Sequence, residues 1–593
     1  MVRFDMTDCA ERDVALLREQ LRVSDALAQV LVRRGYGDPD AARAFLAADE
    51  HHELDEFTGL QDAAEAILAH VRAGNRITIH GDYDVDGVCS TAILVRALRK
   101  LDAKCDWYLP DRASDGYGLS AATVRRLASA GTQLLITVDC AITAVEEVAL
   151  ARSLGIETIV TDHHLPRADG LLPDAPIVHP ALCDYPCREL CAAAVAHKLA
   201  QATLRAAGGD PREIDEDLDL VALATIADVV ALVGENRALV RRGLRALAAT
   251  AKPGLRALMS VAGVDPGKVG ERAVAFALAP RINAAGRLYR ADAALELILT
   301  TDPQRAAQVA QELDRANSER RHTEQSIRVQ AEAQIARLAD REQRSAFVLA
   351  GEGWHPGVIG IVASRLAERH RRPVVMISLD GETGRGSGRS IEGYDLLGGL
   401  TACAEQLVRY GGHSAAAGVE LRREHLAAFA VALDAHAASV LSPEDLIARE
   451  RVDAIVDGAQ LDMSLAEELA ILAPFGRGNP TVSLMVRDAI LRDVRPMGQG
   501  KHARFTVESG GVHARAVAFG NDGKLGVQEG EPVDATFVLE VNEWRGASEP
   551  RLVLRHAQAA SKRATLKPCP ISGPVQSTLF PLPAPLAASA ATS

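Results

Sequence analysis

The sequence predicts a multidomain α/β protein: a parallel-sheet domain, a long helix, a second α/β domain and a small β-barrel. Short apolar runs alternate with helical patterns between residues 76 and 162. Residues 302–340 contain no Gly or Pro after Pro303, and residues 504–541 carry strand-like runs separated by turns. At roughly 150 residues per domain, the 593 residues suffice for about four domains.

The first of these domains follows from three apolar runs, at residues 76–80, 134–139 and 157–162. Helical patterns at 90–100, 121–130 and 144–154 separate or follow them. Strand–helix alternation predicts a parallel sheet with helices on both faces. Functional sites in such sheets lie beyond the carboxyl ends of the strands. The runs end at His80, Asp139 and Asp162, so these residues are expected at that edge.

The remaining segments complete the predicted organisation. We expect a helical segment at 1–50, the parallel-sheet domain with a helical part at 51–300, and a connecting helix at 301–340. A second α/β domain is expected at 341–440 and a β-barrel at 441–560. Residues 561–593 contain no Asp or Glu and are rich in Pro, Ala and Ser, which predicts a disordered tail.

Composition excludes several classes of protein. Apolar residues make up 48% and charged residues 24%, which is typical of a globular chain and not of a disordered or collagen-like one. The net charge of −13 excludes a histone-like protein coated in positive charge. Nucleic-acid binding stays open, because a groove needs only local positive charge.

The cysteines and the N-terminus favour a cytoplasmic protein. Nine scattered cysteines argue against a disulfide framework. Cys183, Cys187 and Cys191 are spaced closely enough to suggest a metal site, but no fourth ligand is evident and Pro186 interrupts the run. The first residues are charged, unlike a signal peptide, and no apolar run is long enough to span a bilayer.

Acidic and histidine residues occur together in four short strings of the sequence. HGDYDVDG contains His80, Asp82, Asp84 and Asp86; VDC contains Asp139; TDHH contains His163 and His164; and IADVV contains Asp228. So many carboxylates repel one another and lose hydration when buried, so a structural role is hard to defend without a cation. Mixed His and carboxylate ligands suit Mn²⁺ or Mg²⁺.

The number of candidate ligands is too large for one open catalytic ion. We therefore predict two ions that share a bridging carboxylate. Two hard cations close together suit phosphoryl chemistry, because they generate a hydroxide and hold the non-bridging oxygens.

These ordered motifs resemble those of the DHH phosphoesterase superfamily. The longer strings PRINAAGR (residues 280–287), DLVALAT (219–225) and GENR (234–237) resemble the RecJ family of bacterial exonucleases. The resemblance covers about residues 50–560. It implies an enzyme that removes 5′-mononucleotides from single-stranded DNA in the 5′-to-3′ direction, in DNA repair and recombination. It also implies DHH and DHHA1 domains joined by the long helix, and an OB-like barrel.

The resemblance implies a role for each motif residue. One metal would be held by Asp86, Asp139, His163 and Asp228, and the other by His80, Asp84 and Asp139, which makes Asp139 the bridge. His164 would lie against the scissile phosphate. Asp82 would act in catalysis, by orienting either the loop or a metal-bound water.

A second set of residues is expected to contact phosphate or DNA. Ser387 and Arg389 lie in a Gly-rich basic string, and Gly412 and His413 lie in a second string, GGHS. The two strings together resemble those of the DHHA1 domain. The resemblance implies that they bind the 5′ end. Arg112 and Arg281 are further candidates; the alternative for Arg281 and Arg287 is that they are packing arginines in ion pairs. Trp354 either stacks on a base or packs in the second domain's core.

The C-terminal part suggests binding partners. Trp544 and Arg545 are candidates for stacking and charge contacts in the OB-like barrel. Gln576, Leu579 and Phe580 resemble the short peptide by which bacterial repair proteins dock on the sliding clamp. We expect a monomer that binds single-stranded DNA, with the clamp, single-strand-binding protein and a helicase as candidate protein partners and no membrane.

Two other functions fit parts of the sequence. The first is a DHH phosphodiesterase or pyrophosphatase acting on small nucleotides, which the added barrel argues against. The second is a non-catalytic DNA-binding scaffold, which the intact acids and histidines argue against. Degradation of long single strands would separate all three.

Overall fold

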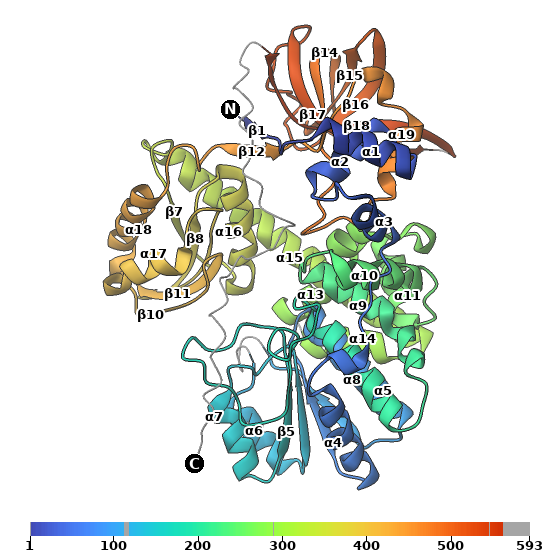
Figure 1. The fold of residues 1–593 in the computed structure, drawn as a ribbon. Helices are drawn as coiled ribbons and strands as arrows, with labels where there is room; N and C mark the ends of the chain where they lie inside the picture. Colours follow the sequence, from blue (N-terminus) through green and yellow to red (C-terminus); the bar gives the residue numbers. More distant parts are fainter. Residues whose placement is uncertain (1, 112–117, 289, 545, 561–593) are drawn as a thin grey trace, which may run out of the picture. The chain divides into compact units, whose positions relative to one another are not determined.

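The computed structural model describes residues 2–111, 118–288, 290–544 and 546–560. The chain divides into two compact units. The first comprises residues 1–3, 52–230 and 239–449, and the second comprises residues 4–51, 231–238 and 450–593. Figure 1 shows the elements of both units. Two short strands, β1 (Val2–Asp5) and β12 (Ala448–Arg451), fall at the unit boundaries along the chain.

The first unit begins with the predicted parallel sheet. Its strand order is β3-β2-β4-β5-β6, and every pairing is parallel. The strands are β2 (Ile77–His80), β3 (Cys105–Tyr108), β4 (Leu134–Val138), β5 (Glu157–Thr161) and β6 (Ile177–Val178). Its helices are α4 (Leu60–Arg72), α5 (Val85–Lys100), α6 (Ala121–Ser129), α7 (Val145–Ser153) and α8 (Ala192–Ala206).

Both faces of this sheet are covered, as a continuous apolar strand requires. Leu134, Ile136 and Val138 pack with α4, α5 and α8 in one core, whereas Leu135 packs with α6 and α7 in another. Figure 1 shows these two layers. The helix α5 begins earlier than the sequence pattern indicated, because Asp84 caps it by accepting hydrogen bonds from the backbone of Asp86 and Gly87.

A helical part follows the sheet. Its helices are η2 (Pro211–Asp217), α9 (Leu218–Ala227), α10 (Gly234–Ala248), α11 (Pro253–Ala262), α12 (Glu271–Ala273), the π-helical η4 (Val274–Leu278), α13 (Ala279–Leu288) and α14 (Ala291–Leu299). The expected long helix is α15 (Pro303–Arg337), capped by Asp302. Its apolar positions, such as Val309, Ala310 and Leu313, join the core of the sheet domain.

The first unit also contains a second sheet with its own helices, at residues 347–440, which we call the second α/β layer. Its sheet is mixed and five-stranded, in the order β10-β11-β9-β8-β7. Its elements are β7 (Phe347–Glu352), α16 (Pro356–His370), β8 (Val374–Asp380), β9 (Thr383–Arg389), α17 (Leu396–Ala402), β10 (Arg409–Gly412), β11 (Ala416–Arg422) and α18 (Leu426–Val440). Only β7 and β8 are parallel. Met376 packs with α16 on one face, and Val375 and Ile377 pack with α18 on the other.

The second unit contains a closed barrel. The strand order β13-β14-β15-β16-β18-β17 is closed by an additional pairing of β14 with β17. The strands are β13 (Ala454–Ile455), β14 (Leu484–Met497), β15 (His502–Ser509), β16 (Val512–Ala518), β17 (Pro532–Trp544) and β18 (Ala547–Ala559). Four helices share its core: α1 (Glu11–Leu21), α2 (Asp25–Arg33), α3 (Pro39–Ala47) and α19 (Met463–Ala470).

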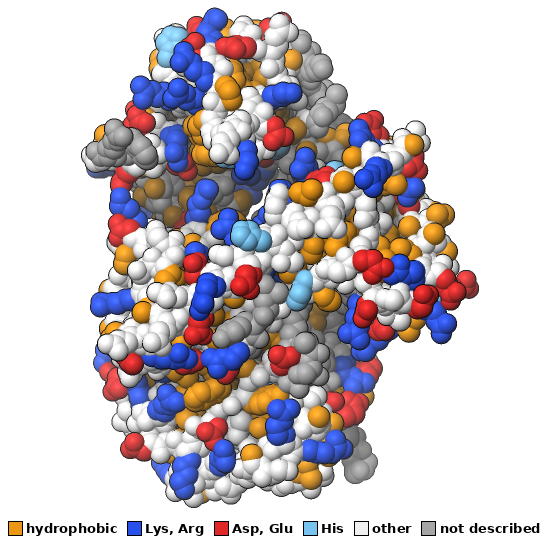
Figure 2. All heavy atoms as spheres, turned by 180° about the vertical axis from the view of Figure 1, so that it is seen from behind, with side chains coloured by type: hydrophobic (Ala, Val, Ile, Leu, Met, Phe, Trp, Pro, Cys, Tyr) orange, Lys and Arg blue, Asp and Glu red, His pale blue; other side chains and the backbone are white. Residues whose placement is uncertain are grey.

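Surface charge is mixed in sign. Figure 2 shows Lys and Arg side chains interspersed with Asp and Glu on the face drawn there. No helix among the described residues is long and apolar enough to cross a membrane.

Candidate metal centre

The acidic strings meet at the carboxyl edge of the parallel sheet, as the topology requires. His80 ends β2, Asp139 follows β4 directly, and Asp162 follows β5 directly. Asp139 adopts a left-handed conformation with φ of 62°, and Ala141 has φ of 81°. Non-glycine residues in this region are uncommon and concentrate at functional sites. The tight turn after β4 therefore fixes the direction of the Asp139 side chain.

The first turn of α5 brings the acids of the HGDYDVDG string together. Gly87 is required for this approach, because a Cβ there would lie 2.5 Å from the backbone nitrogen of Asp82. Asp84 Oδ1 accepts hydrogen bonds from the backbone nitrogens of Asp86 (3.0 Å) and Gly87 (3.1 Å). The string is thus folded on itself at the helix N-terminus, where the helix dipole favours negative charge.

Asp86 is buried and receives two backbone hydrogen bonds from a second helix. The first amides of α8, those of Ala192 and Ala193, each donate to its carboxylate at 2.8 Å. Burial raises the pKa of Asp86 well above its ordinary value, and the charges of Asp228 and Asp84 raise it further. Two backbone donors do not offset this accumulation of negative charge, so the carboxylate is arranged for a cation.

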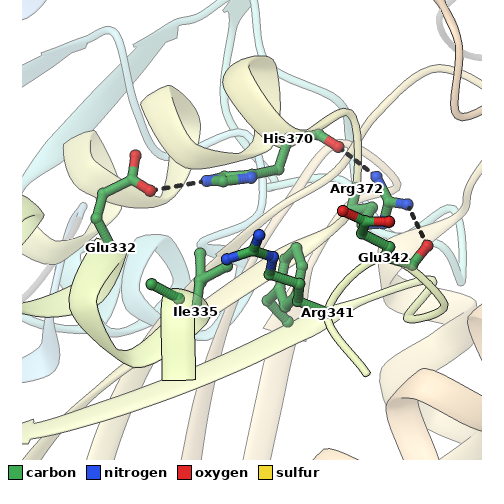
Figure 3. A pocket seen from close by; sticks show the side chains of 8 residues that line it. Glu332, Ile335, Arg341, Glu342, His370 and Arg372 are labelled. Atoms are coloured by element: carbon green, nitrogen blue, oxygen red, sulfur yellow. Dashed lines mark hydrogen bonds and ion pairs between the residues drawn. The ribbon is translucent and has the colours of Figure 1, made fainter. Parts of the chain in front are cut away.

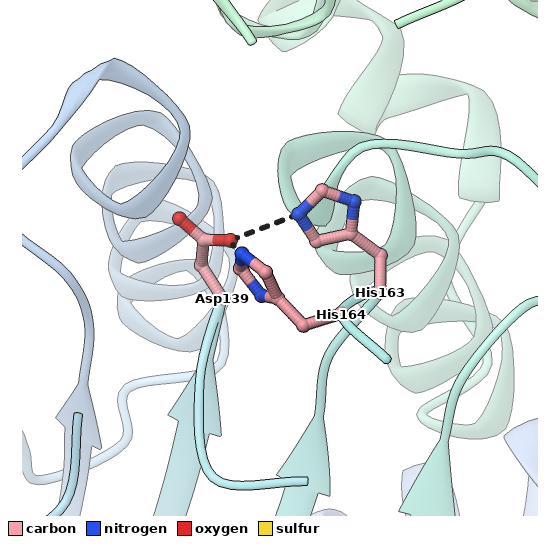
Figure 4. A group of neighbouring side chains, drawn as sticks. All are labelled: Asp139, His163 and His164. Carbon is pink, nitrogen blue, oxygen red and sulfur yellow. Dashed lines mark hydrogen bonds and ion pairs between the residues drawn. The ribbon is translucent and has the colours of Figure 1, made fainter. Parts of the chain in front are cut away.

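Asp139 is the centre of the cluster. Its Oδ1 lies 3.1 Å from His163 Nε2 and 3.7 Å from His164 Nδ1, and Figure 4 shows both rings pointing toward it. Burial raises the pKa of Asp139 well above its ordinary value, and neighbouring carboxylates raise it further, with Asp86 and Asp84 the largest contributors. Two unit charges about 4 Å apart interact by about 4 kcal/mol at an effective dielectric constant of about 20.

The two histidines are held in different protonation states. Burial and the charge of His164 lower the pKa of His163 to about 3, so its ring is neutral and suited to binding metal. Burial lowers the pKa of His164 as well, but its hydrogen bond to Asp162 and the charges of Asp162, Asp228 and Asp86 together outweigh burial and raise that pKa to about 9.

Asp162 organises this loop and was absent from the predicted site residues. Its carboxylate accepts from the backbone nitrogens of Ile142 (2.9 Å), His163 (2.8 Å) and His164 (3.1 Å), and lies 2.8 Å from His164 Nδ1. Burial raises the pKa of Asp162, but the His164 ring outweighs burial and lowers it to about 2. The TDHH string contained Asp162, but only its contacts distinguish an orienting acid from a ligand.

Three overlapping groups of side chains could each hold a metal ion. They are Asp139 with His163 and His164, Asp86 with His163 and Asp228, and Asp82 with Asp84 and Asp139. The ligand atoms within each group lie within 4.8 Å of one another. Asp139 and His163 each belong to two of them, and of the two only the carboxylate of Asp139 has two oxygens with which to bridge two ions. The donor set of carboxylates and imidazoles fits Mn²⁺ or Mg²⁺.

The second predicted metal set differs from the arrangement found among the described residues. Asp82, predicted to orient the loop or a water, is grouped with Asp84 and Asp139. His80, predicted as a ligand, is buried and belongs to none of the three groups. Its Nδ1 lies 3.5 Å from the Cys140 sulfur, a contact between neighbouring strand ends that the sequence did not reveal.

Three predicted phosphate residues of the second α/β layer lie on two strands, β9 and β10, that are separated by β11. Ser387 and Arg389 are on β9, Gly412 ends β10, and both strands flank β11. Arg389 Nη1 donates to Ser387 Oγ at 3.0 Å. Gly412 has φ of 141°, and a Cβ there would lie 2.4 Å from the Ala416 carbonyl, so glycine is required. Burial and the charges of Arg389 and His164 lower the pKa of His413.

Other predicted contact residues are already engaged in packing. Arg281 Nη2 lies 2.8 Å from Asp314 Oδ1, and its Nη1 donates to the Ala277 carbonyl at 2.6 Å. Arg287 donates to the Gly357 carbonyl at 2.9 Å. Trp354 is buried in the core beside α16 and donates to Gln330 at 2.9 Å, so it packs and does not present its face for stacking.

Several candidates lie outside the part of the chain that the structure describes. These are Arg112, Arg545 and the tail residues Gln576, Leu579 and Phe580. Trp544 is the last residue of β17, and its backbone pairs with Ala547 of β18. The cysteine cluster belongs to none of the three metal groups: Cys191 contacts Thr225 at 3.3 Å, and Cys183 donates to the Ile177 carbonyl at 3.3 Å.

A cavity of about 240 Å³ lies elsewhere in the first unit, at the C-terminal end of α15. Figure 3 shows Glu332 paired with His370, and Arg372 bonded to two backbone carbonyls. His370 Nε2 lies 3.0 Å from Glu332, and Arg372 donates to the backbone carbonyls of His370 (2.7 Å) and Glu342 (3.2 Å). These contacts tie the segment that follows α15 to the end of α16.

Comparisons with known proteins agree with this fold and site. Residues 76–225 match the DHH family N-terminal domain, residues 343–439 the DHHA1 domain, and residues 452–556 the RecJ OB domain. The parallel sheet with its metal-binding edge, followed by the second α/β layer, therefore defines a protein of the DHH–DHHA1 class.

Full-length relatives specify the family within that class. The chain is 37% identical over 566 residues to the single-stranded-DNA-specific exonuclease RecJ of Bacillus subtilis, covering 94% of this chain and 71% of the relative. It matches the crystal structure of Thermus thermophilus RecJ in complex with Mn²⁺ with a TM-score of 0.82 and 32% identity, covering 94% of this chain and 79% of that one. It matches the structure of the same protein in complex with Mg²⁺ with a TM-score of 0.76 and 31% identity, covering 94% of this chain and 78% of that one. The chain belongs to the RecJ family of exonucleases.

Proposed function

We propose that this chain is a metal-dependent exonuclease that degrades single-stranded DNA from its 5′ end to 5′-mononucleotides. The observation that carries the proposal is that two histidines and five carboxylates gather at the carboxyl edge of the sheet, and that three of these carboxylates, Asp82, Asp86 and Asp139, are buried. Such a cluster is unfavourable without cations and suited to phosphoryl chemistry with them. Membership of the RecJ family supports DNA as the substrate.

We assign the ligands by the groups in which they meet. Asp86, Asp139, His163 and Asp228 would hold one ion, and Asp82, Asp84 and Asp139 the other. His80, which the resemblance implies as a ligand of the second ion, is in none of the three groups. The bound ions would supply an activated water and neutralise charge on the phosphoryl oxygens. His164, whose side chain is 44% exposed and oriented at Nδ1 by Asp162, would contact the scissile phosphate.

The second α/β layer would hold the 5′ end of the strand. Arg389, Ser387 and His413 offer charge and hydrogen-bond donors, and Gly412 allows the backbone to approach. Because Arg281 is paired with Asp314, phosphate contact by Arg281 would require that ion pair to be exchanged. We propose Arg112 as a further phosphate contact and Trp544 and Arg545 as contacts of the barrel with DNA.

The division of labour follows the predicted boundaries. Residues 51–300 would carry catalysis, 301–340 the connection, 341–440 binding of the strand end, and 441–560 binding of the following single strand. Residues 1–50 would support the barrel, since α1, α2 and α3 share its core. We further propose a cytoplasmic monomer.

The test is a degradation assay on long single-stranded DNA. Strands labelled at the 5′ or 3′ end and a matched blunt duplex are incubated with Mn²⁺, Mg²⁺ or EDTA. We expect immediate release of a labelled mononucleotide from the 5′ end, slow shortening of the 3′-labelled strand, and no attack on the duplex. EDTA should abolish all cleavage.

Matched variants connect the assay to the site. Asp139→Asn should lower cleavage by about a thousandfold or more, because it removes the shared ligand. Asp184→Asn is the control, since that side chain is 85% exposed and pairs loosely with Arg188 at 3.8 Å. Cleavage of small nucleotides alone would favour a phosphodiesterase, and binding without cleavage would favour a scaffold.

We also propose that the tail docks on the sliding clamp through Gln576, Leu579 and Phe580. The string carries two apolar anchors in a segment without acidic residues. Deleting residues 570–593 should weaken clamp binding in a pull-down with purified clamp and leave nuclease activity unchanged. Equal clamp binding by the deleted and full-length chains would rule the peptide out. Single-strand-binding protein and a helicase remain proposed partners.

A further inference from the structure

His179 lies at the end of β6, the strand next to β5 in the parallel sheet. Thr161 pairs with Val178, so the residues that follow the two strands leave the sheet side by side. Asp162 to His164 follow β5, and His179 follows β6. The sheet thereby brings a buried histidine, only 2% exposed, beside the loop that carries the DHH string.

The hydrogen bonds of His179 fix its tautomer. Its Nδ1 accepts from the backbone nitrogens of Ala181 (3.2 Å) and Leu182 (3.3 Å). A nitrogen that accepts two N–H groups carries no proton, so the proton of the neutral ring is on Nε2. That nitrogen lies 2.8 Å from the His164 carbonyl oxygen and therefore donates to it.

The backbone of His164 is consequently held on both sides of its Cα atom. Its N–H donates to Asp162 Oδ1 at 3.1 Å, and its carbonyl accepts from His179 Nε2 at 2.8 Å. The His164 ring is held by the same Asp162 oxygen at 2.8 Å. Neighbouring groups that orient ligands in this way matter to metal sites almost as much as the ligands do.

We propose that His179 is a positioning residue for the metal centre: it fixes the backbone of His164, and through it the placement of His163 and His164 at Asp139. This deepens the proposed function, on which its catalytic consequence rests. His179 touches no ligand atom of the three metal groups and is not itself a ligand.

Two substitutions separate the two ends of the ring. The shorter side chain in His179→Asn places an acceptor where Nδ1 lies, so the hydrogen bonds from Ala181 and Leu182 can be kept. It has no donor that reaches the position of Nε2. His179→Gln keeps a donor at that position and lacks the acceptor. Cys183→Ala is the control in the same segment, because the Cys183 thiol donates to the Ile177 carbonyl and the substitution leaves its backbone bond to His179 in place.

The test measures Mn²⁺ affinity of the full chain by electron paramagnetic resonance, without DNA, and then kcat and KM on single-stranded DNA. We expect His179→Asn to weaken Mn²⁺ binding by about 10–100-fold and to lower kcat with little change in KM. His179→Gln should stay within about threefold of the unmodified chain, as should Cys183→Ala. Thermal unfolding in EDTA establishes that each variant is folded.

Mn²⁺ affinity of His179→Asn equal to that of the unmodified chain would overturn the proposal, because the donor to His164 would then be dispensable. A loss in His179→Gln as large as in His179→Asn would overturn it too, since the turn would then be responsible. Absence of nuclease activity in the unmodified chain would contradict the proposed function instead, because Mn²⁺ binding is measured without DNA.

Discussion

Asp139 is buried among carboxylates, and the pKa of its side chain is raised well above the ordinary value by burial and by Asp86 and Asp84. An ionised Asp139 therefore opposes folding when no cation is bound. We expect Asp139→Asn to melt in EDTA at the same temperature as the unmodified chain or a few degrees higher. With Mn²⁺ present the order should reverse, because only the unmodified chain gains full binding energy. Differential scanning calorimetry with and without Mn²⁺ measures both.

A marked loss of stability of Asp139→Asn in EDTA would show that the carboxylate is structural and contradict this account. Asp184→Asn again provides the control, since its side chain is exposed. It should melt like the unmodified chain under both conditions.

At the scale of residues, the sequence predicted ligand types better than their contacts. The acids and histidines of the three metal groups all lie in four short strings. Three of the strings follow strands of the sheet directly, and the fourth contains Asp228 at the C-terminal end of α9. The supporting residues could not be predicted in this way. The backbone donors of Ala192 and Ala193 to Asp86, and His179, become neighbours only through the folded sheet.

Among the elements, α9 is anchored by a buried ion-pair cluster at its N-terminal end. Lys252, whose side chain is 8% exposed, lies 2.9 Å from Asp219 and 3.0 Å from Asp217. We expect Lys252→Met to lower the free energy of unfolding by about 3–5 kcal/mol, because it leaves the buried Asp219 carboxylate without its cation, whereas Asp217 keeps Arg96 at 2.8 Å. Urea denaturation measures the change.

The double variant Lys252→Met with Asp219→Asn tests the cause of that loss. Removing the charge of Asp219 should restore part of the stability lost in Lys252→Met. A double variant whose loss equals or exceeds the sum of the two single losses would mean that packing of the lysine stem, and not charge, dominates.

The contact of η2 with α8 should depend on pH. Burial raises the pKa of Asp215, but His197 (3.4 Å) and Arg242 (2.6 Å) outweigh it and lower that pKa below its ordinary value. A lowered carboxyl pKa stabilises the fold above the unfolded-state value and loses its effect as pH falls through the folded-state value. Asp215→Asn should therefore be less stable near neutral pH, with the difference shrinking below about pH 4. Denaturant midpoints across that range test this; a constant difference would contradict it.

The bounds of two helices, α15 and α5, show where the sequence pattern was sufficient to predict an element and where it was not. The helix α15 (Pro303–Arg337) matches the predicted polar stretch, because its cap, Asp302, and the absence of Gly and Pro after Pro303 are local signals. The start of α5 was missed by five residues, since the apolar pattern pointed to residue 90 and the helix begins at Val85. There the acidic string supplies the cap, and Gly87 allows close packing on Asp82, which is a tertiary requirement.

At the scale of the whole molecule, all candidate metal ligands lie in the first of the two compact units, and the barrel lies in the second. Mn²⁺ binding should therefore protect the first unit selectively. At a free concentration of 100 times Kd, a bound ligand stabilises its folded state by about 2.7 kcal/mol. Hydrogen exchange should show slower exchange in β4, β5 and the first turns of α5 and α8, with β14 to β16 unchanged. Asp139→Asn should show little of this protection; protection appearing first in the barrel strands would mean that the ions bind elsewhere than at Asp139.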